Sequence, residues 1–351
     1  MRAVRLFAPG DVRCVEVDKP TADDPRDVII RVKACGVCGS DIMRVMEKGA
    51  YRYPITIGHE FAGVVESVGG GVDDIAPGDR VTIMPLIPCG RCDYCRIGQY
   101  VLCDDYQYYG SRIDGAMAEY IRVTADNVLK LPEGVDWEAG AMTDPVSVAL
   151  HAVRKTGLEA GQSVAVLGLG AIGLLTVQWL RKRAAGTIFA VDVYPEKLEL
   201  ARDLGADIAI DGRETDAVEA ILEKTAGEGV DAVIELAGNK VTQVQAIQAA
   251  RKMGTVVYCG ISYDDLTIPN KALSRILRGE LNLRGAWNSS IAPLPINEWI
   301  VSLEELGRGQ FVTDRIVSHR FPLERCQDCF NMMYGRTEVF NKVMFLPEKT
   351  P

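Results

Sequence analysis

The apolar stretch "SVAVLGLGAIGLLTVQWL", residues 163–180, constrains the fold of this 351-residue chain more than any other segment. It is uncharged and long enough to mimic a membrane helix. Its spaced glycines instead predict a strand, a tight turn and the start of a helix. Asp192 ends the next apolar run, 19 residues after the last of these glycines. This combination indicates a dinucleotide-binding site. The G-x-G-x-x-G pattern is formed by Gly168, Gly170 and Gly173.

The same pattern predicts how a nucleotide would bind. Glycines let a pyrophosphate approach the N-terminus of the helix, and Asp192 is placed to accept hydrogen bonds from ribose hydroxyls. A carboxylate there would repel a 2′-phosphate, so NAD is favoured over NADP. Lys197 could lie beside the adenosine ribose, although an exposed helix lysine is an equally good interpretation. The alternative for the glycines is a turn that only packs the helix against the strand.

The rhythm of the chain changes near Glu159. Beyond it, apolar strands alternate with helix-length segments, which predicts a doubly wound parallel sheet. Before it, short Val- and Ile-rich runs broken by Gly, Pro and Asp predict a compact β-rich domain. We therefore expect an α/β protein with domains at 1–155 and 156–290, and a tail, 291–351, that returns to the first domain.

Charge and cysteine content narrow the function classes. With 39 basic and 48 acidic residues, the net charge of −9 disfavours nucleic acid or an anionic membrane as the main partner. No secretory signal is visible at the N-terminus, so a cytoplasmic location is the default expectation. Ten cysteines in such a chain indicate reduced thiols or metal sites rather than a disulfide framework.

Four of the cysteines have the spacing of a closed metal site. They lie in "CGRCDYCRIGQYVLC" within loop 89–103, in the pattern C-x2-C-x2-C-x7-C. Four thiolates complete a tetrahedron, which is typical of structural zinc. An iron–sulfur cluster and a nucleic-acid zinc ribbon are the alternatives. The predicted ligands are Cys89, Cys92, Cys95 and Cys103.

A second metal site is indicated by two glycine-flanked turns. Cys38 lies in "CGVCGSD", and His59 and Glu60 lie in "GHEFAGVVESVG". If Cys38 and His59 bind one zinc ion, Glu60 can orient the site or take a coordination position, and an open position remains for substrate. A buried, hydrogen-bonded histidine is the alternative for His59.

These motifs together resemble the zinc-dependent medium-chain alcohol and polyol dehydrogenases over nearly the whole chain. The resemblance implies a GroES-like catalytic domain, a Rossmann domain and hydride transfer from a secondary hydroxyl of a polyol or polyol phosphate to NAD. It also implies two zinc ions per chain. The catalytic zinc would be held by Cys38, His59 and a carboxylate in "AMTDPVSVALHA", while Ser40 matches the hydroxyl of the family's proton relay.

At that carboxylate the chain departs from the polyol pattern, which has glutamate where Asp144 stands. Aspartate is one methylene shorter, so a closer backbone, a bridging water or Glu60 would have to compensate. Alternatively, Asp144 before Pro145 is the signature of an acidic N-cap followed by a first-turn proline.

The sequence motifs indicate the substrate less directly than they indicate the cofactors. "YPITIGHEF", "YYGSRIDGAMAEYI" and "ILRGELNLRGAWNSS" resemble the galactitol-1-phosphate 5-dehydrogenase branch of the family. Basic residues could then bind a phosphate, and a polar residue could bind sugar hydroxyls, although solvated surface residues would look the same. These candidates are Arg44, Lys48, Arg52, Arg112 and Asn288.

Other functions remain open. The alternatives are an enzyme for an unphosphorylated polyol such as sorbitol or xylitol, for a sugar acid, for butanediol or for threonine, and a catalytically silent NAD-binding scaffold. The resemblance further implies a homodimer or homotetramer, with "GTVVYCGI" and "LNLRGAW" as candidate apolar edges.

Overall fold

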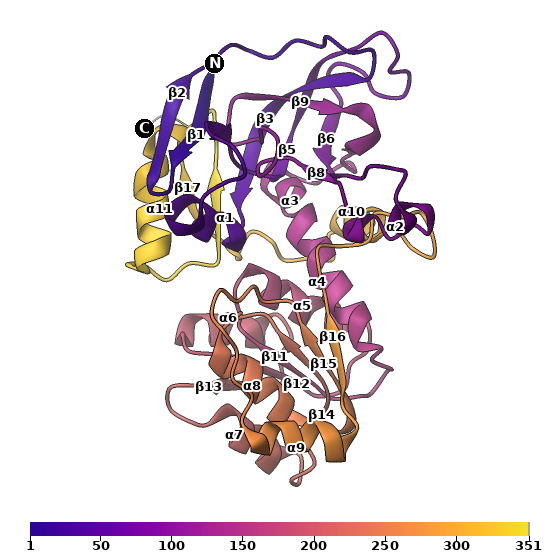
Figure 1. Cartoon of the computed structure of the whole chain (residues 1–351), viewed down its shortest axis with the longest axis vertical. Helices are drawn as coiled ribbons and strands as arrows, with labels where there is room; N and C mark the ends of the chain where they lie inside the picture. Colours follow the sequence, from indigo (N-terminus) through magenta and orange to yellow (C-terminus); the bar gives the residue numbers. More distant parts are fainter. Residues whose placement is uncertain (350–351) are drawn as a thin grey trace. The chain divides into compact units, whose positions relative to one another are not determined.

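The computed structural model describes residues 1–349 and has the expected α/β class (Figure 1). By its internal contacts the chain divides into two compact units. Met1–Asp144 and the segment from Ser290 onward form the first unit, and Pro145–Ser289 form the second.

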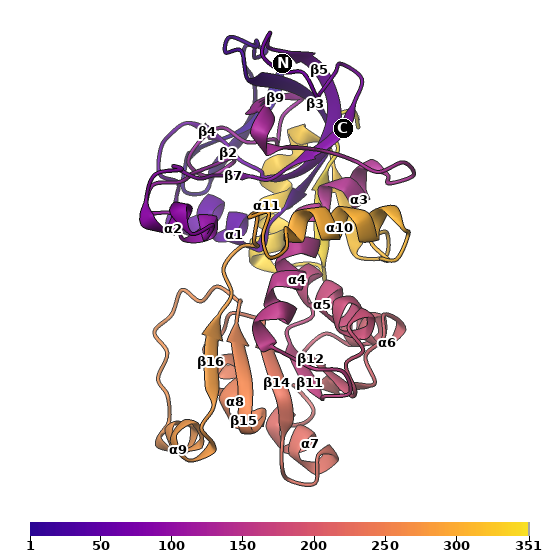
Figure 2. The same ribbon diagram turned by 90° about the vertical axis from the view of Figure 1, so that its right-hand side faces the viewer.

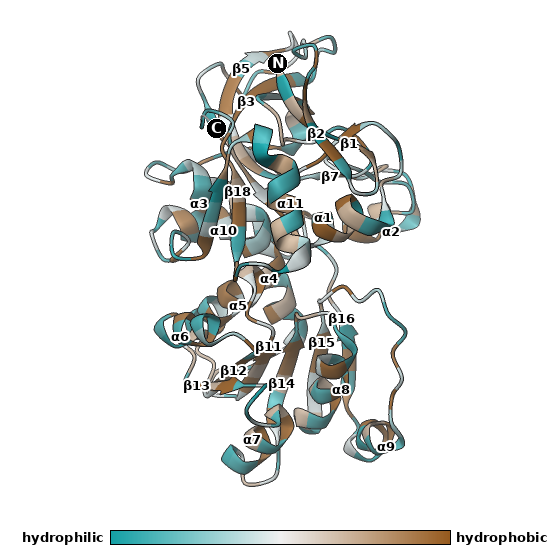
Figure 3. Cartoon of the chain, turned by 90° about the vertical axis from the view of Figure 1, so that its left-hand side faces the viewer, coloured by the Kyte–Doolittle hydropathy of each residue, from teal (hydrophilic) through white to brown (hydrophobic). Residues whose placement is uncertain are grey.

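The second unit is built on a six-stranded sheet in which every neighbouring pair is parallel. Its order is β13-β12-β11-β14-β15-β16. The order reverses direction between β11 and β14, as in a doubly wound fold. The central strands are strongly hydrophobic because both of their faces are covered (Figure 3). The strands are β11 (Val164–Leu167), β12 (Ile188–Asp192), β13 (Ile208–Asp211), β14 (Val230–Glu235), β15 (Ala250–Tyr258) and β16 (Asn282–Gly285).

Helices connect these strands in two groups. α5 contacts α6, whereas α8 contacts both α7 and α9 (Figure 2). Right-handed crossovers that run in opposite directions from the centre of the sheet place such groups on opposite faces. The helices are α5 (Ala171–Lys182), α6 (Pro195–Asp203), α7 (Ala217–Lys224), α8 (Lys240–Ala249) and α9 (Asn270–Gly279).

The apolar stretch that opens this unit is divided between two elements. β11 supplies its first part and α5 its second, with the glycine turn between them. Gly168 has φ +98°, and a Cβ at Gly173 would lie 2.0 Å from the carbonyl oxygen of Gly168, so larger residues would disrupt the turn. Among the described residues, the helices are all too short or too polar to cross a membrane.

The first unit is β-rich. Its largest sheet has the order β10-β6-β5-β3-β18-β17, with β9 also paired to β3. The strand β18, near the end of the chain, pairs antiparallel with β3 near its beginning. The strands are β1 (Arg2–Ala8), β2 (Asp11–Glu16), β3 (Asp27–Val37), β4 (Ile55–Thr56), β5 (Glu60–Val68), β6 (Arg80–Ile83), β7 (Leu86–Ile87), β8 (Gln107–Tyr108), β9 (Tyr120–Thr124), β10 (Val128–Lys130), β17 (Val317–Phe321) and β18 (Lys342–Phe345).

Short helices complete the first unit, and α11 packs into its hydrophobic core. Its helices and helical turns are α1 (Gly39–Met43), η1 (Arg44–Lys48), α2 (Asp93–Arg96), η2 (Tyr100–Leu102), η3 (Ala125–Asn127), α3 (Trp137–Ala141), α10 (Glu298–Gly307), η4 (Leu323–Arg325) and α11 (Cys326–Gly335). The two units divide inside α4 (Thr143–Thr156), after Asp144, whereas the sequence suggested a boundary at 155.

Candidate metal centres and nucleotide site

Two neighbouring antiparallel strands bring Cys38, His59 and Glu60 together. β3 pairs with β5 so that Gly36 lies opposite Glu60. Cys38 follows the end of β3, and His59 precedes the start of β5, so both side chains meet at the same end of the pair. A Cβ at Gly36 would lie 2.4 Å from Glu60 Oε2. Glycine at position 36 therefore makes room for the Glu60 carboxylate.

The three side chains form a group that can hold a metal ion. Their ligand atoms all lie within 4.8 Å of one another. Ser40 donates a hydrogen bond to Cys38 Sγ at 3.3 Å, which brings the expected relay hydroxyl to the group. His59 Nδ1 is buried without a hydrogen-bond partner among residues 1–349, and Asp41 Oδ2 lies 3.7 Å from it. Histidines that bind a metal through one ring nitrogen commonly have a carboxylate beside the other. Asp41 beside Nδ1 is therefore compatible with metal binding through Nε2 of His59.

Asp144 also reaches this cluster, from the first turn of α4. Its Oδ2 lies 3.9 Å from His59 Nε2. The helix begins at Thr143, so Asp144 lies inside it and is not the N-cap that the Asp-Pro pair suggested. Asp144 is not one of the three residues in the tight group of Cys38, His59 and Glu60. Its predicted part as a zinc ligand, direct or through a water, stays a prediction.

The electrostatics of the cluster favour a bound cation. Burial alone lowers the pKa of His59, but Asp41 and the Cys38 thiol outweigh it and raise that pKa to about 10. Burial raises the pKa of Asp144 to about 7, with Glu60 adding to the rise and His59 opposing it. Buried acidic groups that raise each other's proton affinity are also stabilised by a nearby metal ion. A thiol, an imidazole and carboxylates are ligands that zinc prefers, so the donor set fits zinc.

Sequence reasoning missed Lys342, which is part of this cluster. Its Nζ lies 2.5 Å from Glu60 Oε2 and donates to the Val37 carbonyl at 3.1 Å. Both charged side chains are buried. Lys342 lies on β18, 282 residues from Glu60, so only the pairing of β18 with β3 brings them together. No local sequence signal identifies such a contact.

The four-cysteine loop forms a second metal-binding group. The ligand atoms of Cys89, Cys92, Cys95 and Cys103 all lie within 4.8 Å of one another. All four cysteines are free thiols. Backbone N–H groups, that of Arg91 first, lower the pKa of Cys89 to about 6, which favours a thiolate. Burial raises the pKa of Cys95 to about 12, and a metal ion beside it would favour its thiolate. This loop fits a structural zinc ion.

In the second unit, Asp192 is tied to the glycine turn. Its Oδ2 accepts a hydrogen bond from the backbone N–H of Leu169 at 2.6 Å, and its Oδ1 accepts one from Val193 at 2.7 Å. The carboxylate thus lies at the carboxyl edge of the parallel sheet, where nucleotides bind in such folds. Lys197 lies over the ring of Tyr194, 5.0 Å from its centroid, which fits a surface role as well as a nucleotide contact.

The basic candidates for substrate binding differ in their partners. Arg44 is paired with the buried Asp41, and Lys48 is paired with Glu47.

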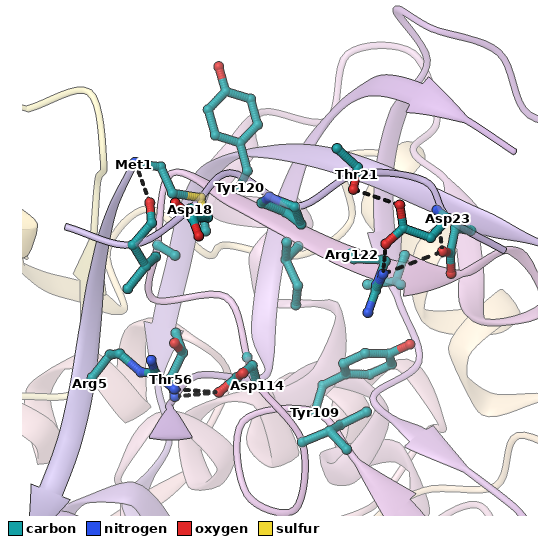
Figure 4. Close-up of a pocket in the computed structure, with 18 of the residues that line it drawn as sticks. Met1, Arg5, Asp18, Thr21, Asp23, Thr56, Tyr109, Asp114, Tyr120 and Arg122 are labelled. Carbon is teal, nitrogen blue, oxygen red and sulfur yellow. Dashed lines mark hydrogen bonds and ion pairs between the residues drawn. The ribbon is translucent and has the colours of Figure 1, made fainter. Parts of the chain in front are cut away.

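Arg52 is paired with Asp114 at 3.1 Å. Both line a groove of about 670 Å³ that does not include the metal-binding cluster (Figure 4). Arg112 instead contacts two tyrosine rings. Asn288 lies in the second unit and has φ +51°.

Comparison with known proteins gives the family. Residues 24–133 match the alcohol dehydrogenase GroES-like domain, and residues 171–306 match the zinc-binding dehydrogenase domain. Galactitol 1-phosphate 5-dehydrogenase of Escherichia coli K12 is 33% identical over 349 residues, which are 99% of this chain and 100% of that protein. The chain therefore belongs to the zinc-type alcohol dehydrogenases.

Other similar proteins span several activities. Sorbitol dehydrogenase of Bacillus subtilis is 33% identical over 92% of this chain and 91% of its own. The crystal structure of galactitol-1-phosphate dehydrogenase from E. coli covers 99% of this chain and 100% of its own, with a TM-score of 0.93. A Sinorhizobium meliloti protein whose crystal structure contains NADP is 34% identical, covers 99% of both chains and has a TM-score of 0.91.

These findings confirm the general predictions made from the sequence. The chain has a GroES-like domain and a Rossmann-like nucleotide-binding domain. It is an oxidoreductase of the zinc-dependent medium-chain type, with zinc and a nicotinamide dinucleotide as its cofactors. The relatives that are named for a substrate include dehydrogenases of galactitol 1-phosphate, sorbitol, L-idonate and L-threonine.

Proposed function

We propose that this enzyme oxidises a secondary hydroxyl of a polyol or polyol phosphate, of the galactitol 1-phosphate type, with NAD as hydride acceptor. The main support is the convergence of Cys38, His59 and a buried carboxylate in one unit of a chain whose other unit carries the dinucleotide fingerprint. Full-length similarity to a galactitol 1-phosphate 5-dehydrogenase supports the substrate class.

Each residue of the cluster has a part in this proposal. Cys38 and His59 hold the catalytic zinc, and Asp144 or Glu60 supplies the carboxylate ligand. The metal, when bound, supplies a Lewis acid that lowers the pKa of the substrate hydroxyl, and NAD supplies the hydride acceptor. Ser40 takes the hydroxyl proton toward solvent.

Lys342 neutralises Glu60, and the position of Asp41 beside Nδ1 orients the His59 ring. Cys89, Cys92, Cys95 and Cys103 hold the structural zinc.

NAD is the proposed physiological acceptor because of Asp192. Both of its carboxylate oxygens are held by backbone N–H groups, so the charge is fixed at the end of β12. A fixed negative charge there repels the 2′-phosphate of NADP. Gly168, Gly170 and Gly173 admit the pyrophosphate, and Lys197 lies beside the ribose.

We also propose that the enzyme is a homo-oligomer joined through the second unit. β16 is the edge strand of the parallel sheet, and all of its residues are exposed. Its Leu283 and the α9 residues Leu273 and Leu277 are exposed apolar side chains. An unpaired strand with apolar neighbours favours association with a second copy. Sedimentation of the wild type and of Leu283→Asp tests this, since a charged edge should yield monomers and an unchanged mass would refute the interface.

The substrate proposal is tested by initial rates of NAD reduction on a paired panel. Galactitol 1-phosphate is compared with galactitol, sorbitol, xylitol, L-idonate, butanediol and threonine, and the best substrate is repeated with NADP. A higher kcat/KM for the phosphorylated polyol supports the proposal. A preference for a neutral polyol, sugar acid or amino acid selects the corresponding alternative. No turnover of any alcohol by the zinc-loaded protein would favour the silent scaffold.

A further inference from the structure

The guanidinium of Arg112 lies over two aromatic rings. Its guanidinium carbon lies 4.2 Å from the centroid of the Tyr106 ring and 4.7 Å from that of Tyr51. A cation–π contact attracts the charge of a guanidinium and does not use its N–H groups as hydrogen-bond donors. The ring contacts therefore leave the N–H groups of Arg112, which can bind a carboxylate or phosphate in a bidentate manner, available.

The charge of Arg112 also lacks a carboxylate partner in the part of the chain that the structure describes. No Asp or Glu oxygen of residues 1–349 lies within 4.0 Å of its guanidinium nitrogens. The other basic candidates, Arg44, Lys48 and Arg52, are each paired with an acidic residue. An anionic ligand would have to displace those carboxylates, but it would meet no such competition at Arg112.

A series of ring contacts connects Arg112 with the metal-binding cluster. The Tyr106 and Tyr108 rings meet edge to face with centroids 6.3 Å apart, and Tyr108 meets the His59 ring in the same way at 5.4 Å. The Tyr108 ring therefore lies directly beside the metal-binding cluster. The segment 106–112 thus carries the Tyr108 ring beside His59 and, at Arg112, a cation without a carboxylate partner among residues 1–349.

We propose that Arg112 binds an anionic group, phosphate or carboxylate, at the far end of a polyol whose reacting hydroxyl lies at the metal-binding cluster. This inference rests on the proposed function and makes Arg112 the residue that selects charged over neutral polyols. Tyr51 and Tyr106 contact the guanidinium, and Tyr108 lies along the carbon chain between the two ends. Arg44, Lys48 and Arg52 have no direct part in this selection.

The test compares Arg112→Met with Arg52→Met, because both substitutions remove one guanidinium from the same unit. The assay is kcat/KM for NAD reduction with galactitol 1-phosphate, L-idonate and galactitol. A charge-assisted bidentate contact predicts that Arg112→Met lowers kcat/KM on the preferred anionic substrate by about 10- to 100-fold relative to galactitol. Arg52→Met should leave the preference for the anionic substrate intact. The two anions distinguish a phosphate site from a carboxylate site.

A binding measurement separates this inference from the proposed function. Calorimetric titration of the zinc-loaded protein with galactitol 1-phosphate, L-idonate and galactitol needs no turnover. Anion-selective binding that Arg112→Met abolishes supports the role of Arg112, even if no alcohol is oxidised and the proposed function fails. Equal losses on charged and neutral ligands, or a loss of selectivity in Arg52→Met instead, would overturn it while leaving zinc-dependent polyol oxidation intact.

Discussion

The buried pair of Lys342 and Glu60 allows a quantitative prediction. The two side chains are 4% and 2% exposed, and their charged atoms lie 2.5 Å apart. Lys342→Met removes the ammonium but keeps most of the apolar stem, so the Glu60 carboxylate is left buried without its cation. Breaking a buried pair in this way costs about 3–5 kcal/mol. For a unit of this size that loss lowers the melting temperature by roughly 6–20 °C.

The assay is urea denaturation of the metal-free protein, compared with the zinc-loaded protein. In the metal-free state Lys342, Arg44 and a protonated His59 offset the charges of Asp41, Glu60 and Asp144. A bound zinc ion adds positive charge, so Lys342→Met should destabilise the zinc-loaded protein less than the metal-free one. By linkage, the variant should then bind zinc more tightly than the wild type does.

The double variant Glu60→Gln/Lys342→Met is the matched control. It removes both charges, so in the metal-free protein it should be more stable than Lys342→Met alone. A loss below about 1 kcal/mol for Lys342→Met, which is within the range of exposed pairs, would refute the claim that this ion pair stabilises the cluster. Additive effects of the two substitutions would refute it as well.

Three further predictions concern other parts of the chain. Asp192→Ser should raise the ratio of kcat/KM for NADP over NAD at least about tenfold, since a repulsive charge is removed; an unchanged ratio in initial rates would contradict this. Cys103→Ser should lower the zinc content by about one ion per chain and leave the other ion bound, as metal analysis can check. Burial raises the pKa of Glu235, so its contribution to stability is fully present below its unfolded pKa of about 4.5 and is lost as pH rises through that value toward the folded pKa. As pH rises above about 4.5, the wild type should therefore lose stability relative to Glu235→Gln, so the melting temperature of the variant minus that of the wild type should increase. A difference that stays constant from pH 4 to 8 would contradict this.

The features that could be predicted from the sequence depend on local spacing. The glycine turn needs only a strand, three glycines and a helix in succession, and the four-cysteine loop needs only one loop. Cys38 and His59 were also within reach, because each lies in a glycine-flanked turn at the end of a strand. In the structure the pairing of β3 and β5 brings them together.

The features that could not be predicted depend on contacts between distant segments. Lys342 reaches the cluster only because β18 pairs with β3. Four basic residues looked equivalent in the sequence, yet only Arg112 lacks a carboxylate partner among residues 1–349, because pairing is decided by tertiary neighbours. The start of α4 at Thr143 was missed because Asp-Pro is also a common helix-cap signature.

The central claim is that Cys38 and His59 hold the zinc ion required for oxidation of a polyol by NAD. It is tested most directly by measuring zinc content and NADH production together in the wild type and in Cys38→Ser. The account predicts about two zinc ions per chain and polyol-dependent NADH production in the wild type, with about one zinc ion and no turnover in the variant. A variant that keeps both zinc ions and oxidises the polyol at the wild-type rate would contradict it.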